Sequence, residues 1–498
     1  MIKKILVANR GEIAVRIIRS CQEMGIQTVA VFSEADRTSP HVLKADEAYF
    51  IGPPSASESY LNVSKILEVS SLSRADAVHP GYGFLSENTD FANAIISAGI
   101  TWIGPSPDVI TMMGDKIAAR TLAETVGAPI VPGTTSPIEN ISEAMSAAER
   151  IGYPVLIKAA GGGGGKGMRI VRSADGLSTA IERAGSEAGK AFADRRIYME
   201  KYLEEPHHIE IQALADQHSN ALIFGERECS VQRRYQKIIE ETPSPFIDDP
   251  VRVSLQKSAL DIIRVCHYVG AGTIEFLVDK HKNFYFLEMN TRLQVEHPVT
   301  EMVNQIDFVK EQIQIANGER LSIKQDDLSP SGHAIECRIY AEDGYHKFTP
   351  SVGTIHSLDI PGGPGVRFDE GIRAGQLITP YYDPLLGKLI AWGRDRDEAL
   401  NRMIRALSEF HINGLETTIP FCLAFIRQPL FRSGRYCTHT LEEIFPAVIS
   451  EMTGKDENLQ VAGSIAGILV HQNDRRPAPL LTGGLSSWLN EGRKENLQ

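Results

Sequence analysis

Three observations predict an α/β fold, in the wide sense that includes α+β. Short apolar runs alternate with a segment of helical spacing in the first hundred residues, at 4–8, 13–21, 28–32 and 75–78. This alternation is typical of βαβ units around a doubly wound parallel sheet. Strand-like alternation of period two follows, as at 209–214 and 283–290. From 332 to about 445, strand signals and Gly/Pro turns predict a β-rich C-terminal part.

The composition excludes several classes of protein. A chain of 498 residues corresponds to about three domains at roughly 100–200 residues each. Its formal net charge of −12 argues against a binder of nucleic acid or of anionic membranes. The N-terminus reads as a strand entering a helix, because Arg10 and Glu12 interrupt its apolar run. Six scattered cysteines without a C-x-x-C pair indicate reduced thiols in a cytoplasmic protein without a membrane span.

A glycine-rich loop is the strongest local feature. The apolar segment 155–158 ends in Lys158, and after two alanines come five glycines, Lys166 and Gly167. Consecutive glycines leave main-chain N–H groups open to phosphate oxygens, and a neighbouring lysine neutralises phosphate charge. The loop is not a Walker A motif, because Gly167 stands where Ser or Thr would bind magnesium. A flexible linker is the alternative, although linkers rarely join two apolar strands.

Alternating acids and amides form a second feature. If residues 284–296 continue as one regular strand, its polar residues share a face, namely Glu288, Asn290, Arg292, Gln294 and Glu296. A further acid, Glu275, lies on the preceding predicted strand and can meet Glu288 if the two strands form a hairpin. Oxygen ligands of this kind suit Mg²⁺ together with substrate phosphates. The alternative is a solvated amphipathic strand.

Three weaker features accompany these two. Arg233, Arg234 and Lys237 form a basic run that fits either an anion site or a solvated face. The pair His207–His208 lacks metalloprotease spacing. The segment 79–88 reads as a tight loop at a sheet end, with or without a ligand. Taken together, the residues predict an ATP-dependent ligase with a small anionic second substrate.

Specific motifs extend the prediction. The chain contains ANRGEIAVRI, HPGYGFLSEN, MGDK, GGGGGKGM, MEKYLE, EMNTRLQVEHPVTE and ECRIYAED. From Ile2 to about Leu441 it therefore resembles biotin carboxylase, the ATP-grasp component of biotin-dependent carboxylases. RLQVEHPVTE beside HPGYGFLSEN points to the carboxylase branch of the ATP-grasp enzymes. The resemblance implies ATP-dependent carboxylation of biotin through carboxyphosphate made from bicarbonate.

The resemblance also implies residue roles. The ATP-binding residues would be Lys116, Lys158, Gly163, Gly164, Gly165, Lys166, Gly167, Met168, Glu200, Lys201, Leu203, His208, Gln232, Tyr235, Glu275 and Glu288. Glu275, Glu288 and Asn290 would hold Mg²⁺ or Mn²⁺, two ions in all. Bicarbonate would contact Lys237, Arg292, Gln294 and Val295. Glu296 would be the general base and Arg338 would stabilise the biotin enolate, so that the catalytic set is Glu296, Arg338, Arg292 and Lys237.

The implied organisation has four parts. We expect an N-terminal α/β domain over 1–113, an ATP-grasp domain over 114–330 with a lid at about 131–203, a β-rich C-terminal domain over 331–446 and an extension over 447–498. The family usually dimerises, and the resemblance places Arg19, Glu23 and Arg367 at the dimer contact. Solvated charges are the alternative for all three.

Several expectations concern partners. The chain has no Met-Lys-Met biotinyl motif, so biotin would arrive on a separate carrier protein, and a further subunit would supply the carboxyltransferase. A helix predicted over 459–470 would dock a partner or pack on its own domain. Tyr235 stands where the family often has histidine, a change next to the ATP pocket. Pyruvate and acyl-CoA both stay open as the final acceptor.

Two other functions compete with this one. Another ATP-grasp carboxylating ligase, of carbamoyl-phosphate or purine-pathway type, would not respond to biotin. A catalytically silent nucleotide-binding regulatory subunit would lack at least one of the acids, the lysines or Arg338, and all are present.

Overall fold

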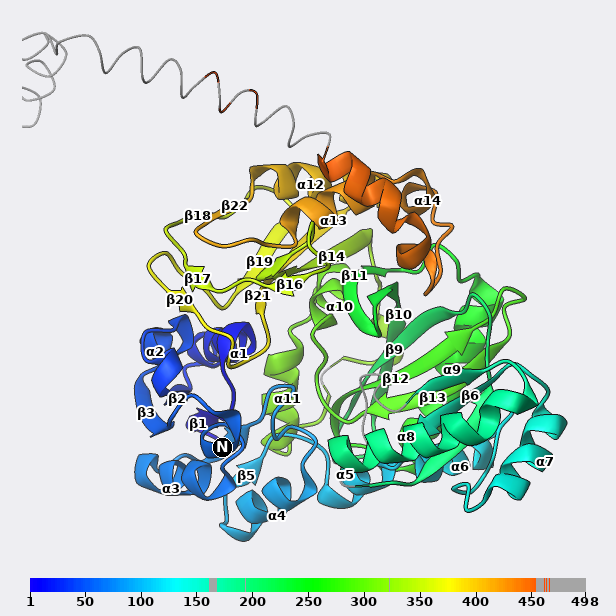
Figure 1. Cartoon of the computed structure of the whole chain (residues 1–498). Helices are drawn as coiled ribbons and strands as arrows, with labels where there is room; N and C mark the ends of the chain where they lie inside the picture. Colours follow the sequence, from blue (N-terminus) through cyan, green and yellow to red (C-terminus); the bar gives the residue numbers. More distant parts are fainter. Residues whose placement is uncertain are drawn as a thin grey trace, which may run out of the picture. The chain divides into compact units, whose positions relative to one another are not determined.

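The computed structural model describes residues 1–160, 168–192, 194–321 and 323–453, together with residues 461, 463 and 465 (Figure 1). The chain divides into two compact units, Met1–Val448 and Ile449–Gln498. The predicted helix over 459–470, three of its residues excepted, lies outside the described residues. Within the described parts, every helix is too short or too polar to traverse a bilayer.

The N-terminal part is a doubly wound parallel sheet, as predicted. Its strands are β1 (Lys4–Val7), β2 (Gln27–Ser33), β3 (Glu47–Gly52), β4 (Ala77–His79) and β5 (Thr101–Trp102), in the order β3-β2-β1-β4-β5. The helices that connect them are α1 (Gly11–Glu23), α2 (Pro40–Lys44), α3 (Val63–Ser73) and α4 (Thr89–Ser97).

Alternate residues of β1 pack on opposite sides of this sheet. Ile5 and Val7 join a core with α1 and with α11 (Phe308–Ala316), whereas Leu6 joins a core with α3 and α4. The sheet is therefore covered on both faces, as parallel sheets require. Helix α5 (Pro107–Gly114) then leads to α6 (Lys116–Thr125), whose first turn is capped by the Asp115 carboxylate.

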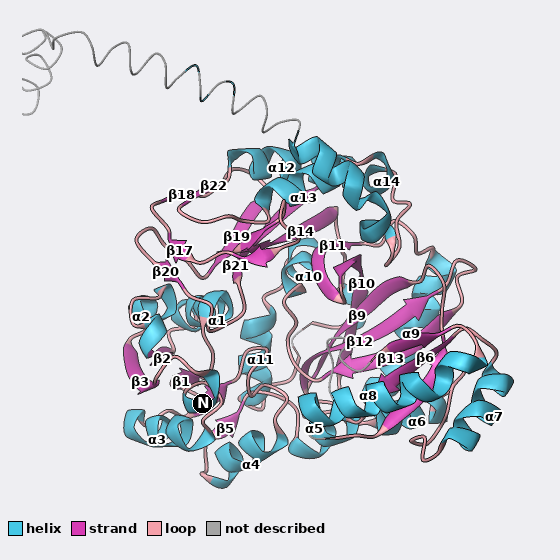
Figure 2. Cartoon of the chain, in the orientation of Figure 1, coloured by secondary structure: helices cyan, strands magenta, loops and turns pink. Residues whose placement is uncertain are grey.

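A small antiparallel sheet follows within the predicted lid. Strands β6 (Val155–Ala159), β7 (Arg169–Val171) and β8 (Ile197–Lys201) are ordered β7-β6-β8. Helices α7 (Ile141–Ile151) and α8 (Leu177–Phe192) lie beside this sheet (Figure 2). They share an apolar core with its strands.

An eight-stranded antiparallel sheet occupies the centre of the first unit. Its order is β13-β12-β9-β10-β11-β14-β21-β19. The strands are β9 (His207–Ala215), β10 (Ala221–Arg233), β11 (Gln236–Thr242), β12 (Gly270–Val278), β13 (Phe284–Asn290), β14 (His333–Tyr340), β19 (Val366–Glu370) and β21 (Leu385–Gly393). Because β11 pairs with β14, the sheet runs without interruption through the expected domain boundary at residue 330.

The remaining elements surround this sheet. Helix α9 (Asp249–Val265) covers the apolar face of β9 and β12, and α10 (His297–Asn304) precedes α11. The C-terminal part adds α12 (Arg396–Glu409), α13 (Ile419–Arg427) and α14 (Pro429–Arg432). Short paired strands complete it: β15 (Glu342–Asp343), β16 (Thr349–Pro350), β17 (Gly353–Thr354), β18 (Ser357–Asp359), β20 (Leu377–Ile378) and β22 (His411–Asn413). This part is β-rich, as predicted.

Candidate active site

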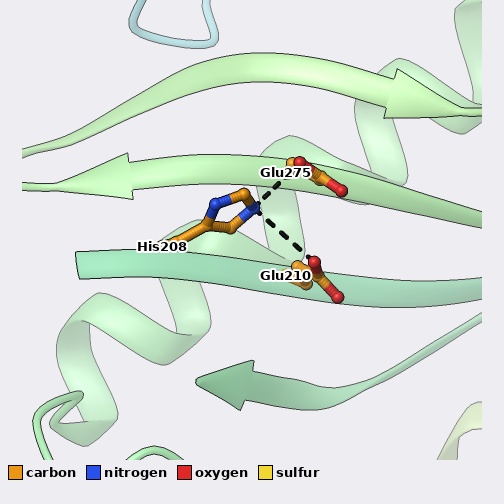
Figure 3. Close-up of side chains that lie close together, drawn as sticks. All are labelled: His208, Glu210 and Glu275. Atoms are coloured by element: carbon orange, nitrogen blue, oxygen red, sulfur yellow. Dashed lines mark ion pairs between the residues drawn. The ribbon is translucent and has the colours of Figure 1, made fainter. Parts of the chain in front are cut away.

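Strand β9 carries one apolar face and one polar face, although the whole strand is buried. Ile209 and Ile211 enter the core under α9, whereas His208 and Glu210 face the opposite way beside Glu275 of β12 (Figure 3). His208 Nε2 lies 2.8 Å from Glu275 Oε2 and 3.5 Å from Glu210 Oε1. These three side chains could offer ligand atoms that all lie within 4.8 Å of one another. The polar face of the sheet is therefore a buried ionic site.

Lys237 lies at the centre of this site. Its ammonium contacts Glu210 and lies 3.1 Å from Glu275 Oε1 and 2.8 Å from Glu296 Oε1. Burial lowers the pKa of Lys237, but the three carboxylates outweigh burial and raise that pKa well above its ordinary value. Burial likewise raises the pKa of Glu275 and Glu296, and Lys237 reverses the effect, so that both pKa values lie well below the ordinary one. Both carboxylates are therefore ionised at neutral pH.

Arg338 joins the site from the C-terminal part of the chain. Its Nη2 atom donates to Glu296 Oε2 at 2.9 Å, and its Nε atom donates to Glu240 Oε1 at 2.6 Å. The Glu296 carboxylate thus lies between two cations, one on β11 and one on β14. The continuous sheet is what brings these two strands together.

The strand predicted over 283–290 is confirmed, and its regular alternation does not continue to Glu296. Strand β13 ends at Asn290, and α10 begins at His297 with Pro298 in its first turn, so the intervening segment turns instead of staying extended. The hairpin prediction is confirmed, since Glu275 lies directly opposite Glu288. The predicted polar residues still converge, because hydrogen bonds replace strand register in the segment 291–296.

Two of those residues illustrate this convergence. Arg292 donates to Asn290 Oδ1 at 2.9 Å and to Glu87 Oε2 at 2.8 Å, which ties the segment 79–88 to the site. Gln294 donates to Glu275 Oε1 at 2.7 Å. Gln294 therefore reaches Glu275, a partner of Lys237, and Arg292 reaches Asn290, despite the irregular backbone.

A second charged group lies on the lid side. Lys116, at the start of α6, contacts Glu288. Glu200 contacts both Lys158 and Arg120. Burial raises the pKa of Glu200, but the two cations outweigh it and lower that pKa. The two predicted phosphate-binding lysines are therefore held by buried or half-buried acids.

Other predicted residues lie at the margins of these groups. Gln232 contacts His208 Nδ1 at 2.9 Å. The Lys201 ammonium donates to the main-chain carbonyls of Gly152 and Tyr153, whereas Tyr235 is 53% exposed. The side chains of Leu203 and Met168 are partly exposed. The glycine-loop predictions lie outside the described residues: Gly163, Gly164, Gly165, Lys166 and Gly167.

The sequence analysis missed four buried charged residues around Lys237 and Glu200, namely Arg227, Glu210, Arg120 and Glu240. Arg227 is fully buried, and its guanidinium donates to Glu210 Oε2 at 3.0 Å. Glu210 had a signal, since it follows His208 by two residues on one strand face. Arg120 and Glu240 had none, because their partners come from distant strands.

The acids and the amide fit a divalent cation. Glu275 and Glu288 face each other across β12 and β13, and Asn290 lies two residues further along the same strand. Side chains directly opposite on paired strands have Cβ atoms roughly 5 Å apart. Two carboxylates and an amide oxygen, with Lys116 against Glu288, are oxygen donors of the kind that Mg²⁺ uses together with substrate phosphates.

Fold and site together define a ligase of the ATP-grasp class. The family model of the biotin carboxylase N-terminal domain matches residues 1–110, and that of the C-terminal domain matches 336–443. Between them, the carbamoyl-phosphate synthase L chain ATP-binding domain model matches 115–324. The chain belongs to the biotin carboxylase family.

Individual relatives agree with this assignment. The chain is 52% identical over 443 residues to biotin carboxylase 1 of Bacillus subtilis, covering 89% of this chain and 98% of the relative. It is 51% identical over 441 residues to the biotin carboxylase of a Nostoc species, covering 89% and 99%. The biotin carboxylase domain dimer of Hydrogenobacter thermophilus 2-oxoglutarate carboxylase, solved with MgADP, ADP and bicarbonate, superposes with a TM-score of 0.87 at 47% identity over 90% and 99% of the chains.

These comparisons confirm the predicted family, fold class and enzyme class. The chain is an ATP-dependent ligase that carboxylates biotin. ATP and biotin are its substrates and Mg²⁺ is its metal cofactor, as predicted. The flanking domain models favour this reaction over the carbamoyl-phosphate alternative.

Proposed function

We propose that the chain makes carboxyphosphate from ATP and bicarbonate and then carboxylates biotin on a separate carrier protein. The chemistry takes place at the Lys237 cluster, which consists of Lys237, Glu210, Glu275, Glu296 and Arg338. One observation carries the proposal: the ionised Glu296 carboxylate lies between Lys237 and Arg338 in a buried site. Bicarbonate is an anion, so in binding it would take over part of the positive field of these cations. Glu296 would then regain basicity and become the base that the reaction requires.

The steps follow from these positions. Glu296 takes the bicarbonate proton, and a bicarbonate oxygen attacks the γ-phosphorus of ATP as ADP leaves. Carboxyphosphate breaks into CO₂ and phosphate, the phosphate takes the ureido proton of biotin, and the biotin nitrogen attacks CO₂. Arg338 stabilises the biotin enolate. Lys237, Arg292, Gln294 and the main chain at Val295 hold bicarbonate.

The remaining roles concern the nucleotide. Lys116 and Lys158 would bind its phosphates, and Glu275, Glu288 and Asn290 would hold Mg²⁺ or Mn²⁺, which neutralises phosphate charge. The Glu200 carboxylate is engaged by Lys158 and Arg120. Adenine would therefore meet the main chain of Glu200 and Lys201 at the end of β8 and of Leu203 just after it. His208, Gln232 and Tyr235 complete the ATP set, with Met168 and the glycine loop 163–167.

We further propose the assembly of the enzyme. The Hydrogenobacter domain is described as a dimer, which supports a homodimer here. The predicted contacts Arg19, Glu23 and Arg367 already have partners within the chain, in Glu370, Lys310 and Glu301 respectively, so a dimer would add to these pairs. The proposed partners are a biotin carrier protein and a separate carboxyltransferase.

Domain boundaries and location are proposals as well. We place the domain boundaries after residues 113, 330 and 446, as predicted from the sequence. The boundary after residue 330 crosses the continuous sheet. All six cysteines are free, which supports a reducing compartment such as the cytoplasm.

The test is ADP release by the purified chain with Mg·ATP and bicarbonate, with and without free biotin. We expect a rate that biotin stimulates and that disappears without bicarbonate. A rate indifferent to biotin would contradict the proposed acceptor.

A further inference from the structure

The turn that carries the base has a main-chain support on its buried side. Residues 291–296 belong to no strand or helix, so strand pairing does not fix their backbone. The Val295 carbonyl accepts a hydrogen bond from the Lys388 ammonium at 2.9 Å. Lys388 belongs to β21, in the C-terminal part of the chain, and its side chain is fully buried.

Lys388 lies beside the arginine of the site. Strands β14 and β21 pair with Arg338 directly opposite Lys388, and residues directly opposite share a sheet face. Arg338 holds the side chain of Glu296, while Lys388 holds the main chain of the preceding residue. Two neighbouring strands thus clamp two consecutive residues of one turn.

The charge of Lys388 is balanced away from the site. Its Nζ atom lies 3.2 Å from Glu12 Oε2 on α1 and 3.8 Å from Asp369 Oδ2 on β19. Arg367 in turn pairs with Asp369 at 2.7 Å. A buried ammonium is costly unless it is paired and hydrogen-bonded, and here two carboxylates and a main-chain carbonyl meet that requirement.

We propose that Lys388 is a positioning residue for the carboxylation reaction, fixing the main chain at Val295 and thereby the placement of Glu296 and of the bicarbonate contacts. In this proposal Lys388 acts through the turn and not through its own contact with a reactant. The inference rests on the proposed function, because it assigns Lys388 an effect on bicarbonate. A loosened turn would weaken bicarbonate binding, whereas the ATP contacts on α6 and the lid would be retained.

The test compares Lys388→Met with the matched control Lys4→Met. Lys4 also pairs with a glutamate, Glu47 at 2.6 Å, and donates to a main-chain carbonyl, Ser73 O at 3.0 Å, but it lies in the N-terminal sheet. ADP release is measured while the concentration of bicarbonate is varied at saturating ATP, and then while that of ATP is varied at saturating bicarbonate. We expect Lys388→Met to raise the KM for bicarbonate about tenfold, corresponding to roughly 1.4 kcal/mol, with the KM for ATP changed less than twofold. Lys4→Met should change neither.

Conservative variants separate positioning from general stability. Lys388→Arg keeps a buried donor and charge, and should return the bicarbonate KM to within about threefold of the wild-type value. Should Lys388→Met fail to fold, Glu12→Gln carries the test at pH 8. Burial raises the pKa of Glu12 to about 7, so at pH 8 the substitution removes a countercharge but leaves the ammonium; we expect a two- to fivefold rise in the same KM.

Two outcomes overturn the inference. One is an unchanged bicarbonate KM in a folded Lys388→Met or Glu12→Gln enzyme, and the other is an equal rise in both KM values. Failure of the proposed function is distinguishable, because it would show in the wild type as ADP release that needs neither bicarbonate nor biotin.

Discussion

Adjacent residues of one strand, Glu240 and Glu241 of β11, face opposite sides of the central sheet and differ in ionisation. Glu240 has Arg338 on one oxygen, while its Oε2 atom has no hydrogen-bond partner within the described residues. Glu241 accepts hydrogen bonds from His333 at 2.6 Å, from Arg396 at 2.7 and 2.9 Å and from Tyr436.

The number of donors decides the difference, since both carboxylates are buried. Burial raises the pKa of Glu240 and Arg338 lowers it by less, so that the pKa lies at about 7. Burial also raises the pKa of Glu241, but the hydrogen bonds from His333 and Arg396 outweigh it and lower that pKa to about 2. We call the side of the sheet with Glu240 and Arg338 the reactive face, and the side with Glu241 and His333 the structural face. The acid on the reactive face titrates near neutrality, whereas the acid on the structural face has several hydrogen-bond donors.

Glu296→Ala on the reactive face should give the largest effect. We expect bicarbonate-dependent turnover to fall by about 10²–10⁴-fold, the usual contribution of a general base. Binding of Mg·ATP should be retained, because the lysines and metal ligands are untouched. Steady-state ADP release and nucleotide titration check this, and wild-type turnover in the variant would remove Glu296 from its role.

Glu241→Gln on the structural face should affect stability instead. Removing one partner from a buried ion cluster costs about 3–5 kcal/mol, here because His333, Arg396 and Tyr436 lose their anion. Urea unfolding measures the loss, and turnover per folded molecule should stay near the wild-type value. A stable but inactive variant would break the division between the two faces.

The pH dependence of stability should differ between the same two residues. Glu241 has a lowered pKa, so its contribution is complete above its ordinary value of 4.5 and is lost as pH falls toward about 2, by about 3 kcal/mol. Glu240 has a raised pKa, so stability falls as pH rises from 4.5 to about 7.

Glu240→Gln should therefore flatten the fall between pH 4.5 and 7, by on the order of 1–3 kcal/mol. Glu241→Gln should flatten only the acid limb. Urea midpoints measured from pH 3 to pH 8 decide this, and an unchanged profile in both variants would contradict the assigned pKa shifts.

Tyr235→His should give the smallest effect. Tyr235 is largely exposed at the end of the β10–β11 turn, so we expect the KM for ATP to change by less than about threefold, on the order of 0.6 kcal/mol. Unfolding should be unaffected. A larger shift, measured with ATP as the varied substrate, would show that the tyrosine replaces a direct nucleotide contact.

The same two faces explain what the sequence could predict. Period-two patterns identified β9, the hairpin of Glu275 with Glu288 and the polar residues of the site, because these depend on local register. The period-two pattern could not show where the strand ends, since the chain turns between Asn290 and the start of α10 at His297.

Residues that depend on tertiary pairing gave no local signal. Lys388 and Arg227 are buried cations whose partners lie at least 15 residues away along the chain, and a lone lysine or arginine reads as a surface charge. Likewise, the local sequence around Glu240 and Glu241 does not indicate which carboxylate accepts several hydrogen bonds. The donors come from β14, α12 and the segment after α14.

The pairing of β11 with β14 also bears on how the chain can be divided. A cut in the segment between α11 and β14 would separate the acid of the site from its arginine, and would leave each fragment with an open strand edge in mid-sheet. Such edges pair with any available strand. Co-expressed fragments should therefore reassemble into an active enzyme through this seam, whereas either fragment alone should self-associate.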